Sequence, residues 1–156
     1  MYLHQRHYMS KPPRTSYLIR RAQILTFTNL TDCLRDYNLT PMQYMLLNLS
    51  RRGDLSSAML ARRFSIAPQS MNEMIGALEQ KQLIARTVAG EKRRTLQISL
   101  TPKGVKLLTT CDREVDRMER RLFSSLSASE IHSLRSVLMK FLGSQSVMHR
   151  AASCKG

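Results

Sequence analysis

The sequence predicts a mainly α-helical protein with a small β-hairpin. Two short helical segments flank a turn of about four residues at 64–67. A segment of alternating apolar and polar residues, typical of a strand, follows at 96–100. Longer helical patterns precede and follow this central part, at 16–37 and 104–143. Helix, turn, helix and hairpin in this order predict a winged helix-turn-helix, and the flanking segments are expected to be N- and C-terminal dimerisation helices.

The charge of the chain indicates its class of partner. The chain has 156 residues, with 25 Lys and Arg against 11 Asp and Glu, and so a formal net charge of +14 at pH 7. A protein this basic is attracted to a polyanion, usually nucleic acid or an anionic membrane surface. No apolar run approaches the roughly 18 residues of a membrane span, and residues 1–20 contain no apolar signal-peptide core. We therefore expect a cytoplasmic protein without a membrane partner.

The N-terminal part is expected to contain a basic arm and then a long helix. Residues 1–15 are polar and basic and include Pro12 and Pro13, which predicts a flexible arm. From 16 to 37 the apolar residues recur at steps of three and four, which predicts a helix with more than one buried face. Asn38 interrupts this pattern.

The winged helix is expected to span residues 40–102. Thr40 is a predicted N-cap, Pro41 occupies the first turn, and Gln43 can close a capping box. Shorter helices are expected at 56–63 and at 68–81. The apolar side chains of the second of these are assigned to the core, and they are Met71, Met74, Ile75 and Leu78.

The hairpin and the C-terminal helices complete the predicted domain, which spans 16–143. Ile84 and the segment 96–100 predict two strands, with a basic tip between them as the wing. Thr101-Pro102 is expected to start a long helix with a heptad-like apolar stripe. The stripe consists of Leu108, Cys111, Val115, Met118 and Leu122. A capping box at 127–130 opens the last helix, Gly143 is expected to end it, and 144–156 is expected to be a loose tail.

Six segments resemble the MarR family of winged-helix regulators. They are Leu39-Thr40-Pro41-Met42-Gln43-Tyr44, Ile66-Ala67-Pro68-Gln69-Ser70-Met71, Leu78-Glu79-Gln80-Lys81, Leu83-Ile84-Ala85-Arg86, Arg93-Arg94 and Leu100-Thr101-Pro102-Lys103-Gly104. Their order and spacing are similar to those of the family over roughly residues 16–143. The resemblance implies a homodimeric transcriptional regulator, more often a repressor, that binds a palindromic DNA operator and responds to a small ligand.

The chain departs from the family pattern at three positions. Gln82 stands where a glycine usually follows the recognition helix, so the left-handed turn there is expected to be costly or reshaped. Lys92 replaces the acid that usually precedes the wing arginine pair, with Glu91 one position earlier. Glu73 stands where the family often has a basic residue facing DNA, so that contact is not carried over.

The DNA-binding candidates lie mainly on the recognition helix and the wing. The N-terminal residues of a recognition helix reach base edges, and Gln and Asn can pair bidentately with adenine. A basic wing tip suits a narrow minor groove. The predicted residues are Pro68, Gln69, Ser70 and Asn72 on the helix, Lys92, Arg93 and Arg94 on the wing, and Arg51, Arg62, Arg63 and Lys103 as weaker phosphate contacts. The alternative is a solvated helix face and a solvated loop.

The resemblance implies an effector site between the dimer helices and the winged helix. Residues of the first and second helices are expected to face it, and they are Tyr17, Arg20, Arg21, Tyr44, Met45 and Asn48. Arginines beside aromatic and methionine side chains suit a planar ring that carries a carboxylate. We therefore expect a small aromatic acid of the benzoate, cinnamate or indole-acetate kind. Alternatively, Tyr44 and Met45 are core residues, and the arginines pair with acidic side chains.

Two other functions stay open at this point. Cys33 or Cys111 could switch a redox-sensing regulator, although a cysteine on an apolar stripe is more often a small buried hydrophobe. Cys154 lies in the expected tail and is given no role. The basic charge would also suit a nucleic-acid-binding module without sequence preference. Because the 4 histidines are scattered and no phosphate loop, nucleophile motif or paired metal ligands occur, we expect no enzyme, no metal and no cofactor.

Overall fold

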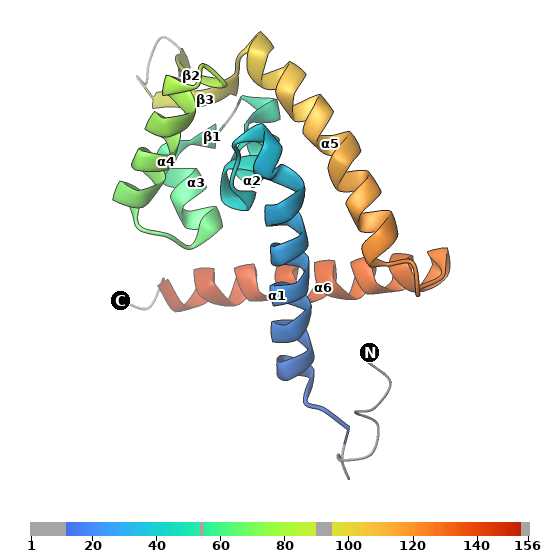
Figure 1. The fold of residues 1–156 in the computed structure, drawn as a ribbon. Coiled ribbons are helices and arrows are strands. Elements are labelled where there is room, and N and C mark those ends of the chain that lie inside the picture. Colours follow the sequence, from blue (N-terminus) through green and yellow to red (C-terminus); the bar gives the residue numbers. More distant parts are fainter. Residues whose placement is uncertain (1–11, 54, 90–94, 154–156) are drawn as a thin grey trace. The chain divides into compact units, whose positions relative to one another are not determined.

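The computed structural model describes residues 12–53, 55–89 and 95–153, and the remaining residues lie outside the described part (Figure 1). The chain divides into two compact units, Met1–Met118 and Glu119–Gly156. The first unit holds the first helix, the winged helix and most of the long helix that follows. The second unit holds the end of that long helix and the last helix.

The first helix, α1 (Thr15–Leu34), covers the predicted segment and continues as a 3₁₀ turn, Arg35–Tyr37. Asn38 ends this turn in the left-handed conformation, with φ 52°, which asparagine adopts more readily than most residues. Among the residues of α1, Leu30 and Leu34 are buried and most others are exposed. The first half of α1 therefore contributes little to the core of its own chain.

The second helix, α2 (Pro41–Leu49), starts with the predicted capping box. The Gln43 backbone N–H donates to the Thr40 hydroxyl oxygen, and the Thr40 backbone N–H donates to the Gln43 side chain. A 3₁₀ turn, Ser50–Arg52, follows. It ends at Gly53 with φ 67°, where glycine has no steric cost.

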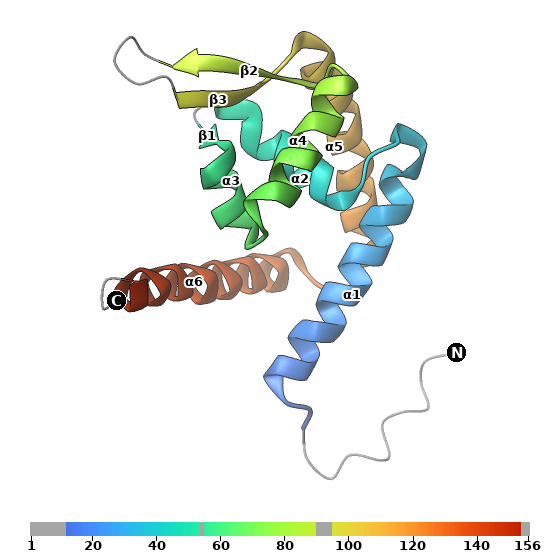
Figure 2. The same cartoon turned by 90° about the vertical axis from the view of Figure 1, so that its left-hand side faces the viewer.

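The helix-turn-helix and the hairpin are confirmed. The pair of helices consists of α3 (Ser57–Phe64) and α4 (Pro68–Gln80), and the hairpin consists of β2 (Ile84–Ala89) and β3 (Thr95–Leu100). Figure 2 shows the hairpin extending beside α3 and α4. Ser65, in the turn between the two helices, is left-handed with φ 54°.

A short strand that was not predicted from the sequence, β1 (Leu55–Ser56), completes the sheet. The strand order is β1-β3-β2, and both pairings are antiparallel. At two residues β1 is too short to show an alternating pattern, so only its pairing with Ile98 and Gln97 defines it as a strand. Ser56 ends this strand and also caps α3, because its hydroxyl oxygen accepts from the Met59 N–H.

The turn after α4 confirms the expected departure at Gln82. This residue is left-handed, with φ 60°, which costs a non-glycine residue about 1–2 kcal/mol. Two hydrogen bonds offset the cost. The Gln82 N–H donates to the Glu79 carbonyl at 2.8 Å, and the Thr101 hydroxyl donates to the Gln82 carbonyl at 2.7 Å. The turn is therefore built without glycine and is fastened to the start of the next helix.

The core of the first unit draws side chains from α1, the winged helix and the following long helix. Met74, which was predicted to be a core residue, is only partly buried. It lies at the edge of the buried face of α4, whose centre is formed by Met71, Ile75 and Leu78. The fully buried apolar side chains are Leu34, Leu46, Leu47, Leu60, Met71, Ile75, Leu78, Ile98, Leu108 and Cys111.

The long helix α5 (Pro102–Leu122) buries most of the predicted stripe. Its buried residues are Gly104, Leu108, Cys111, Val115 and Met118, whereas Leu122 is partly exposed. The stripe therefore packs toward the core of the first unit.

The last helix, α6 (Ala128–Ser153), begins with the predicted capping box, in which the Glu130 N–H donates to the Ser127 hydroxyl oxygen and the Glu130 carboxylate accepts from Ser127. The predicted end at Gly143 is wrong, because α6 continues to Ser153. Gly143 does not take the left-handed conformation of a helix C-cap, and a glycine inside a helix costs only about 1 kcal/mol. Among the described residues, no helix has both the length and the apolar character that a membrane span requires.

Candidate functional site

Helix α4 presents two chemically different faces. Met71, Ile75 and Leu78 are fully buried and anchor the helix in the core. The opposite face is polar over the first turn and a half. The four α4 residues predicted to bind DNA are all exposed in this first turn and a half, and they are Pro68, Gln69, Ser70 and Asn72.

The N-terminus of α4 has no side-chain cap. Ala67 precedes it, whereas α2, α3, α5 and α6 are each capped by a Ser or Thr hydroxyl. The backbone N–H groups of the first turn of a helix lack intrahelical acceptors. Together with the helix dipole, such groups favour an anion such as a phosphate. This end of α4 therefore suits a DNA backbone contact.

Gln69 and Asn72 differ in how freely their amides can contact a base. Gln69 Nε2 donates to Glu73 Oε1 at 3.3 Å, one turn further along α4. A base must compete with this carboxylate for the Gln69 amide. Asn72 is exposed, and its side chain makes no hydrogen bond to any other described residue. Asn72 is therefore the better placed of the two to pair with adenine.

An ion pair fastens the hairpin to α4. Arg86 Nε on β2 lies 3.2 Å from a carboxylate oxygen of Glu79, near the end of α4. No role for Arg86 was predicted from the sequence, and its contact with Glu79 orients the strand that leads to the wing. The wing tip, with the predicted residues Lys92, Arg93 and Arg94, lies outside the described residues.

Of the side chains predicted as weaker phosphate contacts, two are bonded to other residues of the chain and two are not paired with an acidic side chain among the described residues. Arg51 forms an ion pair with Asp112, and Lys103 Nζ donates to the Lys81 carbonyl at 2.9 Å. Arg62 and Arg63 are exposed in the last turn of α3. The structure thus leaves these two arginines of α3 most accessible to a ligand.

A largely apolar pocket of about 520 Å³ lies between α2 and α3. Pockets of about 300–1,000 Å³ are typical of small-molecule sites. Of the predicted effector residues, Met45 and Asn48 line it. Four further lining residues were missed, and they are Met42, Leu49, Arg63 and Phe64. The spacing 42, 45, 49 is a helical pattern visible in the sequence, but it equally predicts an ordinary buried face.

Tyr44 does not line this pocket and instead contacts α5. Its hydroxyl donates to Asp112 Oδ1 at 2.8 Å. Burial and the hydrogen bond to this carboxylate raise the pKa of Tyr44 well above its usual range. The phenol therefore remains protonated, and a donor, at any physiological pH.

A hydrogen-bond network joins Tyr44 to the pocket. Arg51 binds the second oxygen of Asp112, and its Nε donates to Asn48 Oδ1 at 3.2 Å. Asn48 Nδ2 donates in turn to the Tyr44 carbonyl at 3.2 Å. Asn48, which lines the pocket, is thereby connected to Asp112 on α5 by two paths, one through Tyr44 and one through Arg51.

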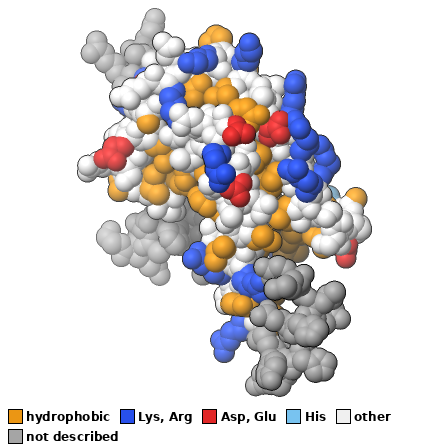
Figure 3. Space-filling model, in the orientation of Figure 1, with side chains coloured by type: hydrophobic (Ala, Val, Ile, Leu, Met, Phe, Trp, Pro, Cys, Tyr) orange, Lys and Arg blue, Asp and Glu red, His pale blue; other side chains and the backbone are white. Residues whose placement is uncertain are grey.

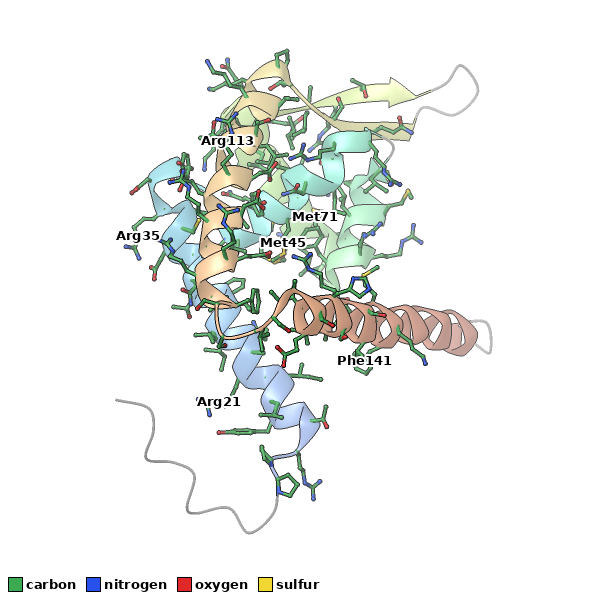
Figure 4. All side chains as sticks on the ribbon, turned by 90° about the vertical axis from the view of Figure 1, so that its right-hand side faces the viewer. Arg21, Arg35, Met45, Met71, Arg113 and Phe141 are labelled. Atoms are coloured by element: carbon green, nitrogen blue, oxygen red, sulfur yellow. The ribbon has the colours of Figure 1, made fainter. Side chains whose placement is uncertain are left out.

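The other three predicted effector residues lie on the first half of α1. Tyr17, Arg20 and Arg21 are exposed. The Arg21 guanidinium lies 5.9 Å from the centre of the Tyr17 ring, and Arg20 donates to Gln23 at 2.7 Å. Figure 4 shows Arg21 well apart from Met45. Within one chain, the structure therefore does not bring these residues together with the pocket.

The environment of Cys111 does not suit a redox-sensing cysteine. Its side chain is fully buried on the α5 stripe. Burial, and to a smaller extent the nearby Asp112 carboxylate, raises the pKa of the Cys111 thiol to about 11. Since the thiolate is the reactive species, roughly one molecule in ten thousand would carry it at pH 7.

Cys111 should therefore resist alkylation in the folded protein. We expect iodoacetamide at neutral pH to leave Cys111 unmodified, because the thiol is both buried and protonated. The control is the guanidinium-unfolded protein, in which all 3 cysteines should react. Peptide mass spectrometry reads the modification. Rapid labelling of Cys111 in the folded protein would contradict this expectation and favour the redox-switched alternative.

A helix-turn-helix with a polar N-terminal face on its second helix, and a hairpin fastened beside it, defines the winged-helix class of DNA-binding proteins. Comparison with known proteins narrows the class. The model of the MarR family matches residues 37–95. The "HTH-type transcriptional repressor Rv2887" of Mycobacterium tuberculosis is 31% identical over 129 residues, which cover 82% of this chain and 92% of that protein. The chain belongs to the MarR family of transcriptional regulators.

Two solved structures of Rv2887 from Mycobacterium tuberculosis are similar to this fold. The first is a complex with DNA, with a TM-score of 0.70 and 26% identity, covering 83% of this chain and 98% of that chain. The second is a complex with salicylic acid, with a TM-score of 0.69 and 26% identity, covering 85% of this chain and 99% of that chain. The predicted fold class, mainly helical with a small β-wing, and the resemblance to the family are both confirmed.

Proposed function

We propose that this chain is a homodimeric repressor that binds a palindromic DNA operator and is released from it by a small aromatic carboxylate. The observation that carries the proposal is the geometry of α4. Its apolar face is fully buried, while its uncapped N-terminal turn presents exposed Pro68, Gln69, Ser70 and Asn72. A rigidly anchored helix with a polar end is what major-groove reading requires.

Electrostatics support DNA as the partner. The net charge of +14 attracts a polyanion, and the relative Rv2887 has been solved in complex with DNA. In Figure 3, Lys and Arg side chains gather along the edge that α5 forms, and exposed Lys106, Arg113 and Arg117 belong to that helix. We assign phosphate contacts to Arg62 on α3 and to Lys92, Arg93 and Arg94 at the wing tip.

Exposed apolar side chains support the homodimer. A single chain rarely exposes so many large apolar side chains on two helices without a partner to cover them. A second copy would bury them symmetrically, and its two-fold axis would match a palindromic operator. The exposed residues are Tyr17, Leu18, Ile19, Ile24, Leu25 and Phe27 on α1, and Leu134, Val137, Leu138, Met139, Phe141 and Leu142 on α6.

The ligand response rests on the pocket and on the relative. Rv2887 has been solved with salicylic acid, and this chain has an apolar pocket with one cation and one amide in its lining. The sequence-derived assignment of Tyr17, Arg20 and Arg21 to the effector site stays a prediction, and it requires these residues to reach the pocket from a second copy. Release follows from linkage, since a ligand that binds the DNA-incompetent arrangement more tightly lowers DNA affinity by the same factor.

The proposal is tested by selecting an operator from random duplex DNA with the full chain and measuring affinity by fluorescence anisotropy at physiological salt. We expect the selected palindrome to bind at least about 10³-fold more tightly than a shuffled duplex. The complex should contain two chains, and an aromatic acid should weaken it. Equal affinity for shuffled DNA would favour the module without sequence preference.

A further inference from the structure

Helix α4 carries an acidic residue, Glu73, on the side that faces away from the core. Successive residues of an α-helix are about 100° apart around its axis. The side chain of Glu73 therefore points about 160° away from those of Met71 and Ile75, which are fully buried. By the same geometry, Asn72 points only about 60° away from Ile75 and lies toward one side of the helix. Glu73 is exposed and lies near the middle of the face that α4 presents outward.

No cation of the described part of the chain neutralises this carboxylate. The sequence of α4 contains no Lys or Arg, and its second acidic residue is Glu79. Glu79 pairs with Arg86 at 3.2 Å, whereas Glu73 takes part in none of the ion pairs among the described residues. An unpaired carboxylate is repelled by DNA phosphates. A helix in the major groove therefore tolerates such a group best where a base offers it a hydrogen-bond donor.

We propose that Glu73 recognises a cytosine in the operator, an assignment that rests on the proposed DNA-binding function and adds a specificity-determining residue to it. In the major groove, the hydrogen-bond donors are the amino groups at cytosine N4 and adenine N6. Guanine and thymine present acceptor atoms, which repel a carboxylate. Adenine also presents the acceptor N7 beside its amino group. Because a carboxylate can only accept, cytosine is the base that matches it best.

Gln69 orients the carboxylate before DNA binds. Its Nε2 donates to Glu73 Oε1 at 3.3 Å, across one turn of α4. The second carboxylate oxygen is bonded to no other described residue and remains able to accept from a base. Ordering an exposed side chain on binding costs free energy. The contact with Gln69 reduces that cost, because it already restricts the rotamers of Glu73.

The helix surface beside Glu73 is open to a base. Gly76 lies three residues further along α4 and therefore next to Glu73 on the helix surface. A Cβ atom added at Gly76 would have no neighbour within 4 Å. No side chain at position 76 thus separates the carboxylate from an approaching base edge, and the helix can enter the groove closely at this point.

The competing interpretation is that Glu73 weakens DNA binding in general, since an exposed carboxylate repels every phosphate alike. Repulsion from the backbone carries no sequence information. The two interpretations therefore differ in one measurable quantity, the base preference. Glu73→Gln distinguishes them, because it removes the charge, nearly keeps the shape of the side chain and introduces a donor.

The first experiment selects operators from random duplex DNA with the full wild-type chain and with Glu73→Gln. The wild-type chain should require a C·G pair at one position of each half-site, and the variant should lose this requirement while keeping the other preferences. Replacing that pair in both half-sites should weaken wild-type binding at least about 30-fold in anisotropy titrations, and binding of the variant by no more than about threefold. Asp116→Asn controls for net charge, because Asp116 is an exposed acid on α5, and it should select the wild-type operator.

Two results would overturn the assignment. One is an identical selected operator for both chains, with the affinity of the variant for every duplex raised by the same factor. The other is a wild-type requirement for an A·T pair at the position that the variant alters. If the wild-type chain selected no operator at all, the proposed function itself would fail, and this result is distinct from the first two.

A modified operator tests the contact at the level of the base atom. N4-methylcytosine keeps Watson–Crick pairing and replaces the amino hydrogen that faces the major groove by a methyl group. In the altered position of each half-site it should weaken wild-type binding about tenfold or more and leave binding of Glu73→Gln nearly unchanged. An equal loss for the two chains would show that Glu73 does not accept from this amino group and would overturn the proposal.

Discussion

Replacing Gly104 by alanine should destabilise the protein by about 3 kcal/mol, which lowers its Tm by roughly 6–12 °C in a chain of this size. Gly104 is buried in the first turn of α5. A Cβ atom there would lie 2.9 Å from the Leu83 carbonyl carbon and closer still to its oxygen. That oxygen cannot move freely, because it accepts a hydrogen bond from the Thr101 N–H at 3.1 Å. The added methyl group must therefore separate α5 from the turn that follows α4.

Gly76→Ala is the matched control for this experiment. Gly76 lies inside α4, and a Cβ atom added there would have no neighbour within 4 Å. Alanine favours a helix interior over glycine by up to about 1 kcal/mol, so this change should leave stability equal or slightly increased. Thermal unfolding followed by circular dichroism measures both variants. A wild-type Tm in Gly104→Ala would show that the junction between the α4 turn and α5 is not closely packed.

Local signals in the sequence predicted the helix starts well. Thr40 with Gln43 and Ser127 with Glu130 form the expected capping boxes, because a cap depends on residues within one turn of each other. The end of α6 was not predicted, since a glycine such as Gly143 ends a helix only where it adopts the left-handed conformation. The strand β1 was not predicted because two residues are too few to show an alternating pattern. It is a strand only through its pairing with β3, which is distant in the sequence.

The candidate site was predictable only where it depends on residues close together in the sequence. The exposed face of α4 follows from periodicity in one helix, and its polar N-terminal residues lie where the sequence placed them. The pocket beside Met45 depends on two helices, because residues of both α2 and α3 line it. Tyr44 and Met45 are adjacent in α2 and so point about 100° apart, which directs Tyr44 to Asp112 and Met45 to the pocket. Arg63 comes from α3 and meets the α2 residues only in the tertiary structure, which no local pattern reveals.

Replacing Asn72 by alanine should reduce the preference for the operator while leaving affinity for shuffled DNA unchanged. Asn72 is exposed on α4 and makes no hydrogen bond to another described residue, so its amide is available to a base. A bidentate contact to adenine contributes about 1–3 kcal/mol of discrimination. A dimer reads two half-sites, and so the specificity ratio should fall by roughly 30-fold or more. The loss should be confined to one base pair in each half-site.

Arg62→Gln is the control that distinguishes loss of base recognition from loss of a phosphate contact. A phosphate contact carries no sequence information, so this variant should weaken binding to the operator and to shuffled DNA by the same factor. Each lost phosphate contact lowers the slope of log K against log salt by about 0.9, and therefore by about two for a dimer. Asn72→Ala should leave that slope unchanged. Anisotropy titrations of both variants at several salt concentrations measure affinity, specificity and slope together. If Asn72→Ala instead weakened both DNAs equally, the polar face of α4 would be positioning the protein on the backbone, and sequence reading would have to come from elsewhere in the chain.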